Sequence, residues 1–108
     1  MDNQHQKIKG YRDLYQEEID LMNRIKQIGV ELLALHDELA NRLCTDFEVK
    51  QAAAIRSQCA PNDFASVEYQ EFNRFKAAEP QRWAEIGKTN IQTGIMALVR
   101  AVAQPTSC

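Results

Sequence analysis

Two groups of cationic side chains are the first candidates for chemistry in this sequence. The first is segment 7–12, which reads K-I-K-G-Y-R and precedes the predicted start of a long helix. Backbone N–H groups and the dipole at a helix N-terminus favour anions, and lysine and arginine add positive charge. Tyr11 adds a flat aromatic face on which a nucleobase can stack. The segment is therefore either an anion-binding element or a solvated basic arm.

The second group is Arg24 and Lys26, which the same helix carries among its apolar residues. They are either ligand contacts or ordinary charges beside an apolar face. Tyr11 and Lys26 are fifteen residues apart, which corresponds to about 20 Å along a helix. One small ligand contacts both only if they come from different subunits or if segment 7–12 folds back. A ligand pocket at a subunit interface satisfies the first condition.

The patterns of known catalytic and metal sites are missing from the sequence. It contains no G-x-S-x-G, no G-x-x-x-x-G-K-[ST] and no H-E-x-x-H. The two histidines, His5 and His36, are far apart in the chain. No C-x-x-C pair joins the three cysteines, Cys44, Cys59 and Cys108. We therefore expect a protein that is not an enzyme, with no metal and no cofactor.

Composition limits the class of protein and its partners. A chain of 108 residues, 44% hydrophobic and 26% charged, is typical of one globular domain. Its net charge of −2 argues against a DNA or RNA polymer as partner, because proteins that bind such polymers present a basic face. The sequence has neither an apolar run long enough to span a bilayer nor a secretory signal, so we expect no membrane contact and a cytoplasmic location.

The spacing of apolar residues predicts a first long helix over residues 13–44, after a basic arm at 1–12. Asp13 and Gln16 have the spacing of a capping box, and an acidic cluster at 17–20 lies where the helix dipole favours it. Gly29 is either a tolerated glycine or a point of close approach to another helix or to a ligand. Seven residues three or four apart form the predicted packing seam: Leu21, Ile25, Ile28, Leu32, Leu35, Leu39 and Leu43.

A helical connector over 45–79 and a last long helix over 80–104 complete the prediction. Thr45 and Asp46 are candidate caps for a short helix over 49–55, and Asp63 for another that follows the turn at 60–63. Pro80 suits the first turn of the last helix, whose seam is Ile91, Ile95, Leu98 and Val102. The fold class is therefore all-α, a long helical hairpin. Apolar residues outside the seams predict assembly into a compact homo-oligomer.

Both ends of the chain resemble a family of phage proteins. The stretches are HQKIKGYRDL…QEEIDLMNRIK and RWAEIGKTNIQTGIMALVRAVAQP, within residues 3–29 and 79–105. They are similar to the anti-CBASS cyclic-nucleotide sponges, which share a helical hairpin domain with anti-Thoeris sponges. The resemblance implies a hexamer in the host bacterial cytoplasm that binds cyclic di- and trinucleotide signals without cleaving them. Such signals otherwise activate a cell-killing effector.

The resemblance also implies roles for particular residues. In the family, a tyrosine of the K-G-Y segment stacks on a base of a cyclic dinucleotide, and a lysine after N-R-I contacts its phosphates. These positions correspond to Tyr11 and Lys26. The family binds cyclic trinucleotides at a separate site between three subunits. Arg82, in P-x-R-W, is the candidate phosphate contact there, and Lys88 and Thr89 are candidates from their position alone.

Two other functions compete with the sponge. Heptad spacing and composition alone favour a structural or assembly protein of a phage, which would be a coiled-coil oligomer with no small ligand. A phosphodiesterase that degrades the signal is the third alternative, and the lack of metal-ligand spacing argues against it.

Overall fold

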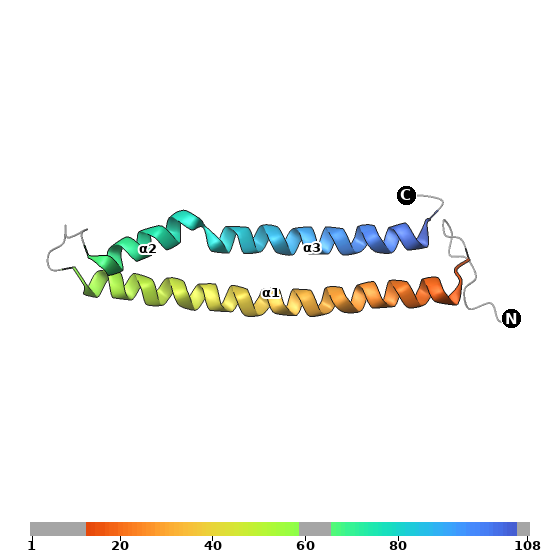
Figure 1. Ribbon diagram of the computed structural model, residues 1–108, viewed down its shortest axis with the longest axis horizontal. Coiled ribbons are helices and arrows are strands. Elements are labelled where there is room, and N and C mark those ends of the chain that lie inside the picture. The colour runs from red at the N-terminus through yellow and green to blue at the C-terminus, as the bar shows by residue number, and fades with distance from the viewer. Residues whose placement is uncertain (1–12, 59–65, 106–108) are drawn as a thin grey trace. The chain divides into compact units, whose positions relative to one another are not determined.

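Every regular element within the described residues, 13–58 and 66–105, is a helix in the computed structural model (Figure 1). The helices are α1 (Gln16–Arg56), α2 (Val67–Ala78) and α3 (Pro80–Ala103). The chain divides into a terminal unit (Met1–Ala34 and Thr89–Cys108) and a middle unit (Leu35–Lys88). In the terminal unit α1 pairs with α3, and in the middle unit it pairs with α2 and the start of α3. The expected all-α fold of paired helices is therefore confirmed. None of the described helices is long and apolar enough to cross a membrane.

Tyr15 caps α1, and the predicted cap at Asp13 was wrong. The backbone N–H of Tyr15 donates to Oε1 of Glu18 at 3.0 Å, and its carbonyl accepts from the N–H of Glu18. This is the backward half of a capping box, in which the third helical residue satisfies the amide of the cap. A cap at Asp13 would start the helix at residue 14, whereas α1 begins two residues later, at Gln16.

The first helix continues to Arg56 instead of ending near residue 44. Thr45, expected to cap a new helix, donates its hydroxyl to the carbonyl of Asn41, as a threonine inside a helix does. The short helix expected over 49–55 is therefore the end of α1. Asp63, the other expected cap, lies outside the described residues.

α2 and α3 meet at a single residue. The hydroxyl of Ser66 caps α2 by accepting from the N–H of Tyr69 at 3.0 Å. Glu79 ends α2 in the left-handed conformation, with φ 51° and ψ 50°, and its N–H donates to the carbonyl of Lys76. Pro80 begins α3, as predicted, because proline needs no backbone donor in the first turn.

An aromatic cluster forms the core of the middle unit. The ring of Phe47 on α1 lies 5.3 Å from that of Phe72 and 6.4 Å from that of Phe75, both on α2. Phe72 and Phe75 are buried. At the edge of the cluster, Lys50 of α1 pairs with Glu71 of α2 at 3.0 Å. The connector is thus held by aromatic packing with an ion pair at its rim.

Five of the seven residues of the predicted seam of α1 are exposed; Ile25 and Leu43 are the two that are partly buried. Ile28 and Leu35 are 63% and 58% exposed, whereas Gly29 and His36, one residue further on, are buried. The packed face is therefore shifted by about one residue around the helix. It consists of Met22, Ile25, Gly29, Leu33, His36, Ala40 and Leu43. On α3 the predicted seam holds, except that Leu98 is 55% exposed.

Candidate functional site

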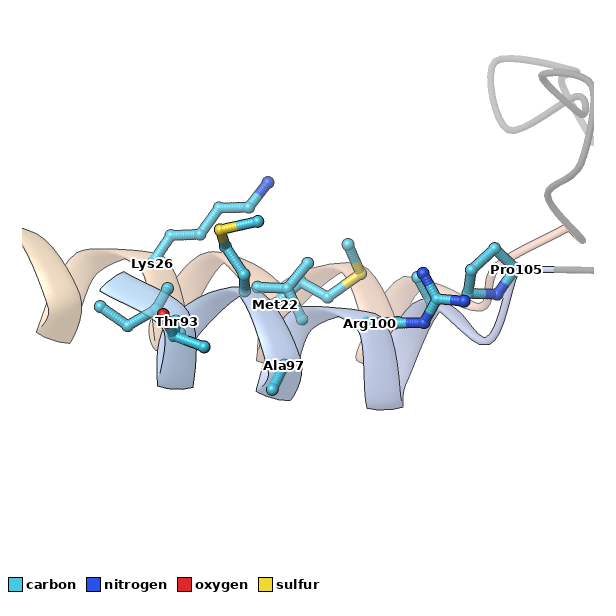
Figure 2. A pocket seen from close by; sticks show the side chains of 10 residues that line it. Met22, Lys26, Thr93, Ala97, Arg100 and Pro105 are labelled. Atoms are coloured by element: carbon cyan, nitrogen blue, oxygen red, sulfur yellow. The ribbon is translucent and has the colours of Figure 1, made fainter. Parts of the chain in front are cut away.

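A groove of the terminal unit is lined by side chains of α1 and α3 (Figure 2). Its volume is about 660 Å³, which lies within the range of pockets that hold small molecules. Met22 and Lys26 come from α1, and the other lining residues come from α3 and the residue pair that follows it. These others are Thr93, Ile95, Met96, Ala97, Val99, Arg100, Ala103 and Pro105.

Gly29 allows the two helices to approach each other beside this groove. A Cβ atom on Gly29 would overlap Cδ1 of Ile95 and would lie 3.0 Å from its Cγ1. Ile95 also lines the groove, and Lys26 is close to one helical turn from Gly29. The lack of a side chain at Gly29 therefore helps to set the position of Lys26 relative to α3.

Two cations are the charged residues among those that line the groove. Lys26 and Arg100 are both exposed, and Figure 2 shows their side chains rising from different helices. Lys26 makes no ion pair or hydrogen bond within the part of the chain that the structure describes. The thioethers of Met22 and Met96 add polarizable apolar surface, and Met96 is 72% exposed. This combination suits an anion that also carries an aromatic face.

The structure places Lys26 in this groove, but the other half of the predicted pair, Tyr11, lies outside the described residues. Arg24, the neighbouring cation, is exposed and is not among the residues that line the groove. Lys26 and Arg24 thus differ in surroundings, although the sequence presents them as one group.

The three residues predicted for a cyclic trinucleotide are not among those that line this groove. The guanidinium of Arg82 lies 3.8 Å from Oε1 of Glu79 and 5.1 Å from the ring of Trp83. Lys88 is half-buried and Thr89 is exposed, both on α3. Arg82 is thus an exposed cation already in contact with a carboxylate and an indole.

Sequence reasoning did not identify Arg100, Met22 or Met96 as parts of a site. Met22 and Met96 are apolar residues outside the predicted seams, and Arg100 is far from Lys26 in sequence. Thr93, Met96 and Arg100 do recur at spacings of three and four on α3, which places them on one helix face. That periodicity is a signal, but it points to a groove only once α3 is paired with the correct part of α1.

His36 is the buried polar side chain of the middle unit. Its Nδ1 lies 3.2 Å from Asp37, and its Nε2 lies 3.7 Å from Oε2 of Glu85 without a hydrogen bond. His36 therefore lies between α1 and α3, with a hydrogen-bond partner at Nδ1 and none at Nε2 among the described residues. No group of three metal-ligating side chains occurs within residues 13–58 and 66–105.

Comparison with known proteins extends over nearly the whole chain. Residues 3–103 match the family described as Acb2/Tad1, hairpin domain. The chain is 65% identical over 108 residues to Anti-CBASS protein 2 of Pseudomonas phage JBD67, and the match covers 100% of both chains. Both matches include residues 30–78, where the sequence alone had suggested no relative. The family resemblance of the two ends is confirmed, and the chain belongs to the Acb2/Tad1 hairpin-domain family.

Proposed function

We propose that this protein sequesters cyclic nucleotide signals of CBASS defence inside the infected bacterial cell and keeps them from their effector. The observation that carries the proposal is the position of Lys26, which lies with a second cation in a groove of small-molecule size. The family and the name of the phage relative support the same assignment. The ligand is a cyclic dinucleotide, with Lys26 on its phosphates and Tyr11 stacked on a base.

Sequestration requires affinity and copy number rather than transition-state chemistry. A charge-assisted hydrogen bond contributes about 1.5–3 kcal/mol, and stacking on an aromatic side chain contributes about 1–3 kcal/mol per base. A cyclic dinucleotide has two phosphates and two bases, so two copies of Lys26 and Tyr11 engage all four groups. After ordering costs, nanomolar binding, about −12 kcal/mol, is within reach. We propose that the ligand stays intact while bound.

The proposed protein is a homo-oligomer, a hexamer as the family resemblance implies. A row of residues on α1 supports self-association, because they recur at heptad-like spacing and remain between 43% and 63% exposed. They are Leu21, Ile28, Leu32, Leu35 and Leu39. Association would bury this row and supply Tyr11 and Lys26 from different copies. Arg82, Lys88 and Thr89 are proposed for a cyclic trinucleotide held between three subunits.

The same row of exposed residues favours a second candidate, an assembly protein without a small ligand. Self-association through α1 would satisfy the apolar surface whether or not the groove binds anything. The two candidates differ in what they predict for Lys26. Under the second candidate, Lys26 contacts no ligand, so removing its charge should leave the function of the protein unchanged.

A release assay tests the proposed function directly. Purified protein is mixed with cyclic GMP-AMP, passed through a size filter and washed, and the retained fraction is heated and chromatographed. Intact nucleotide that is retained and then freed by heat is the expected result. Linear dinucleotide would identify an enzyme instead. The assay is repeated with a cyclic trinucleotide. If neither cyclic GMP-AMP nor the cyclic trinucleotide is retained by the filter, the assembly protein is favoured.

Paired variants assign the binding to the groove. Lys26→Ala should lose retention because it removes the proposed phosphate contact, and Arg24→Ala should retain the nucleotide because Arg24 is not a lining residue. Both variants should melt within a few degrees of the wild-type protein, since exposed charges contribute little to stability. Equal loss in the two variants would contradict a specific role for Lys26.

A further inference from the structure

We infer that the indole of Trp83 stacks on a base of the cyclic trinucleotide for which Arg82 is proposed as a phosphate contact. The inference rests on the proposed function and adds a residue to that site which the family resemblance did not supply. Three subunits that share the site each contribute one Trp83 and one Arg82. The site then offers one indole and one guanidinium group to every nucleotide of the ring.

Trp83 presents an open aromatic surface near the start of α3, where it is 58% exposed. Two other rings of the described chain also lie beside a cation. Lys76 is 4.4 Å from the centre of the Phe72 ring, and Lys50 is 5.8 Å from that of Phe75. Both phenylalanines are buried, so their pairs belong to the core of the middle unit. The ring of Trp83, by contrast, remains accessible to a base.

The position of Arg82 beside this ring suits the phosphate of the same nucleotide. Its guanidinium carbon lies 5.1 Å from the centre of the indole. One sugar joins the base and the phosphate of a nucleotide, so a base on the indole brings its phosphate close to the guanidinium. The planar fork of arginine matches phosphate oxygens, and an aromatic side chain stacks on any base. The pair therefore fits one nucleotide unit.

The carboxylate of Glu79 competes with a phosphate for Arg82. Its Oε1 lies 3.8 Å from the guanidinium, and both side chains are more than half exposed, so this contact contributes little to stability. A phosphate that accepts two hydrogen bonds from the guanidinium would replace it. The carboxylate would then repel the bound phosphate. Glu79→Gln should therefore bind a cyclic trinucleotide more tightly than the wild-type protein.

Fluorescence of the wild-type protein tests the role of Trp83 without any substitution, because the chain contains one tryptophan. The protein is titrated with cyclic tri-AMP, and a stacked base should quench the indole emission until one trinucleotide is bound for every three chains. Linear tri-AMP at the same concentrations corrects for light that the nucleotide absorbs. Cyclic GMP-AMP, which is assigned to Lys26 and Tyr11, should leave the emission nearly unchanged.

Calorimetry with cyclic tri-AMP separates stacking from apolar burial at position 83. Trp83→Phe keeps an aromatic ring and should bind within about fivefold of the wild type. Trp83→Leu keeps apolar area but no aromatic face, and should bind at least about fivefold more weakly, the low end of one lost stack. The matched control is Tyr15→Leu, which also removes an exposed ring and should stay within about twofold. Glu79→Gln should gain affinity in the same assay.

The outcomes distinguish this inference from the proposed function. If the release assay retains cyclic tri-AMP but the emission of Trp83 stays constant, the stacking role is overturned while sequestration stands. A change in oligomer mass of Trp83→Leu in sedimentation would also overturn it, because the indole would then hold copies together. If cyclic GMP-AMP is retained and cyclic tri-AMP is not, the inference fails while dinucleotide sequestration stands. If neither is retained, both fail.

Discussion

Gly29 of α1 and Ile95 of α3 meet so closely that a methyl group at position 29 would collide with the isoleucine side chain. Two opposing effects follow for Gly29→Ala. Alanine favours the helix by about 1 kcal/mol, and overpacking costs about 1–3 kcal/mol. We expect a net loss of about 1 kcal/mol in the wild-type background. In the background of Ile95→Val, which removes the colliding Cδ1, the same change should be neutral or stabilising. Urea unfolding of the four variants measures this coupling.

Phe72 and Leu35 should respond to truncation in different ways. Phe72 is 8% exposed and packs on Phe47, so Phe72→Ala should cost about 3–5 kcal/mol. Leu35 is 58% exposed, so Leu35→Ala should cost much less within one chain. If α1 joins copies, Leu35→Ala should instead lower the mass of the oligomer. Urea unfolding and sedimentation of both variants separate the two effects. A loss of unfolding free energy in Leu35→Ala that does not depend on protein concentration would contradict the exposed position.

Glu71 should make stability depend on pH in strongly acidic solution. Hydrogen bonds from Arg74 and then Lys50 lower the pKa of Glu71 from 4.5 to about 2. A carboxyl group with a depressed pKa stabilises the folded state above the unfolded pKa and loses that contribution as pH falls through the folded value. The melting temperature of the wild-type protein should therefore fall more than that of Glu71→Gln between about pH 4.5 and pH 2.

The matched control for Glu71 is Glu48→Gln, which removes a carboxylate from the exposed surface of α1. It should keep the wild-type dependence on pH over the same interval. If Glu71→Gln and Glu48→Gln show identical melting curves at each pH, the ion pairs of Glu71 do not contribute to folding.

Replacing Glu79 with glycine should raise the free energy of unfolding. Its left-handed backbone, at φ 51°, costs an L-residue about 1–2 kcal/mol, and glycine avoids that cost. Glu79→Gly also removes the contact to Arg82, but an exposed pair at 3.8 Å contributes little. We expect a net gain of about 1 kcal/mol in urea unfolding. Glu79→Ala serves as control, because it loses the carboxylate and keeps the strain; equal stability of the two variants would exclude the backbone as the cause.

The helices could be predicted from local signals, and the packing could not. Pro80 and the unbroken apolar periodicity locate helices because they act within a few residues. α1, however, carries two apolar stripes about one residue apart. The stripe with Ile28 has larger side chains, but the stripe with Gly29 and His36 packs inside. Because glycine and histidine are not strongly hydrophobic, a search for apolar residues does not identify the packed face that contains Gly29 and His36.

The candidate site was only partly predictable for a related reason. Lys26 followed from the family resemblance, because the motif around it is local. Arg100 did not follow, because it lies far along the chain and joins Lys26 only through the register between α1 and α3. That register depends on close packing such as the contact of Gly29 with Ile95, and periodicity alone does not determine it.

The one-residue junction at Glu79 restricts how this chain can vary in length. No loop between α2 and α3 can absorb a change in chain length, and one residue added inside α3 would turn the positions that follow it by about 100°. Homologues should therefore accumulate substitutions at this junction but rarely gain or lose a residue. An insertion inside α3 that keeps its packed face would span about seven residues, which restores the phase after two turns of helix.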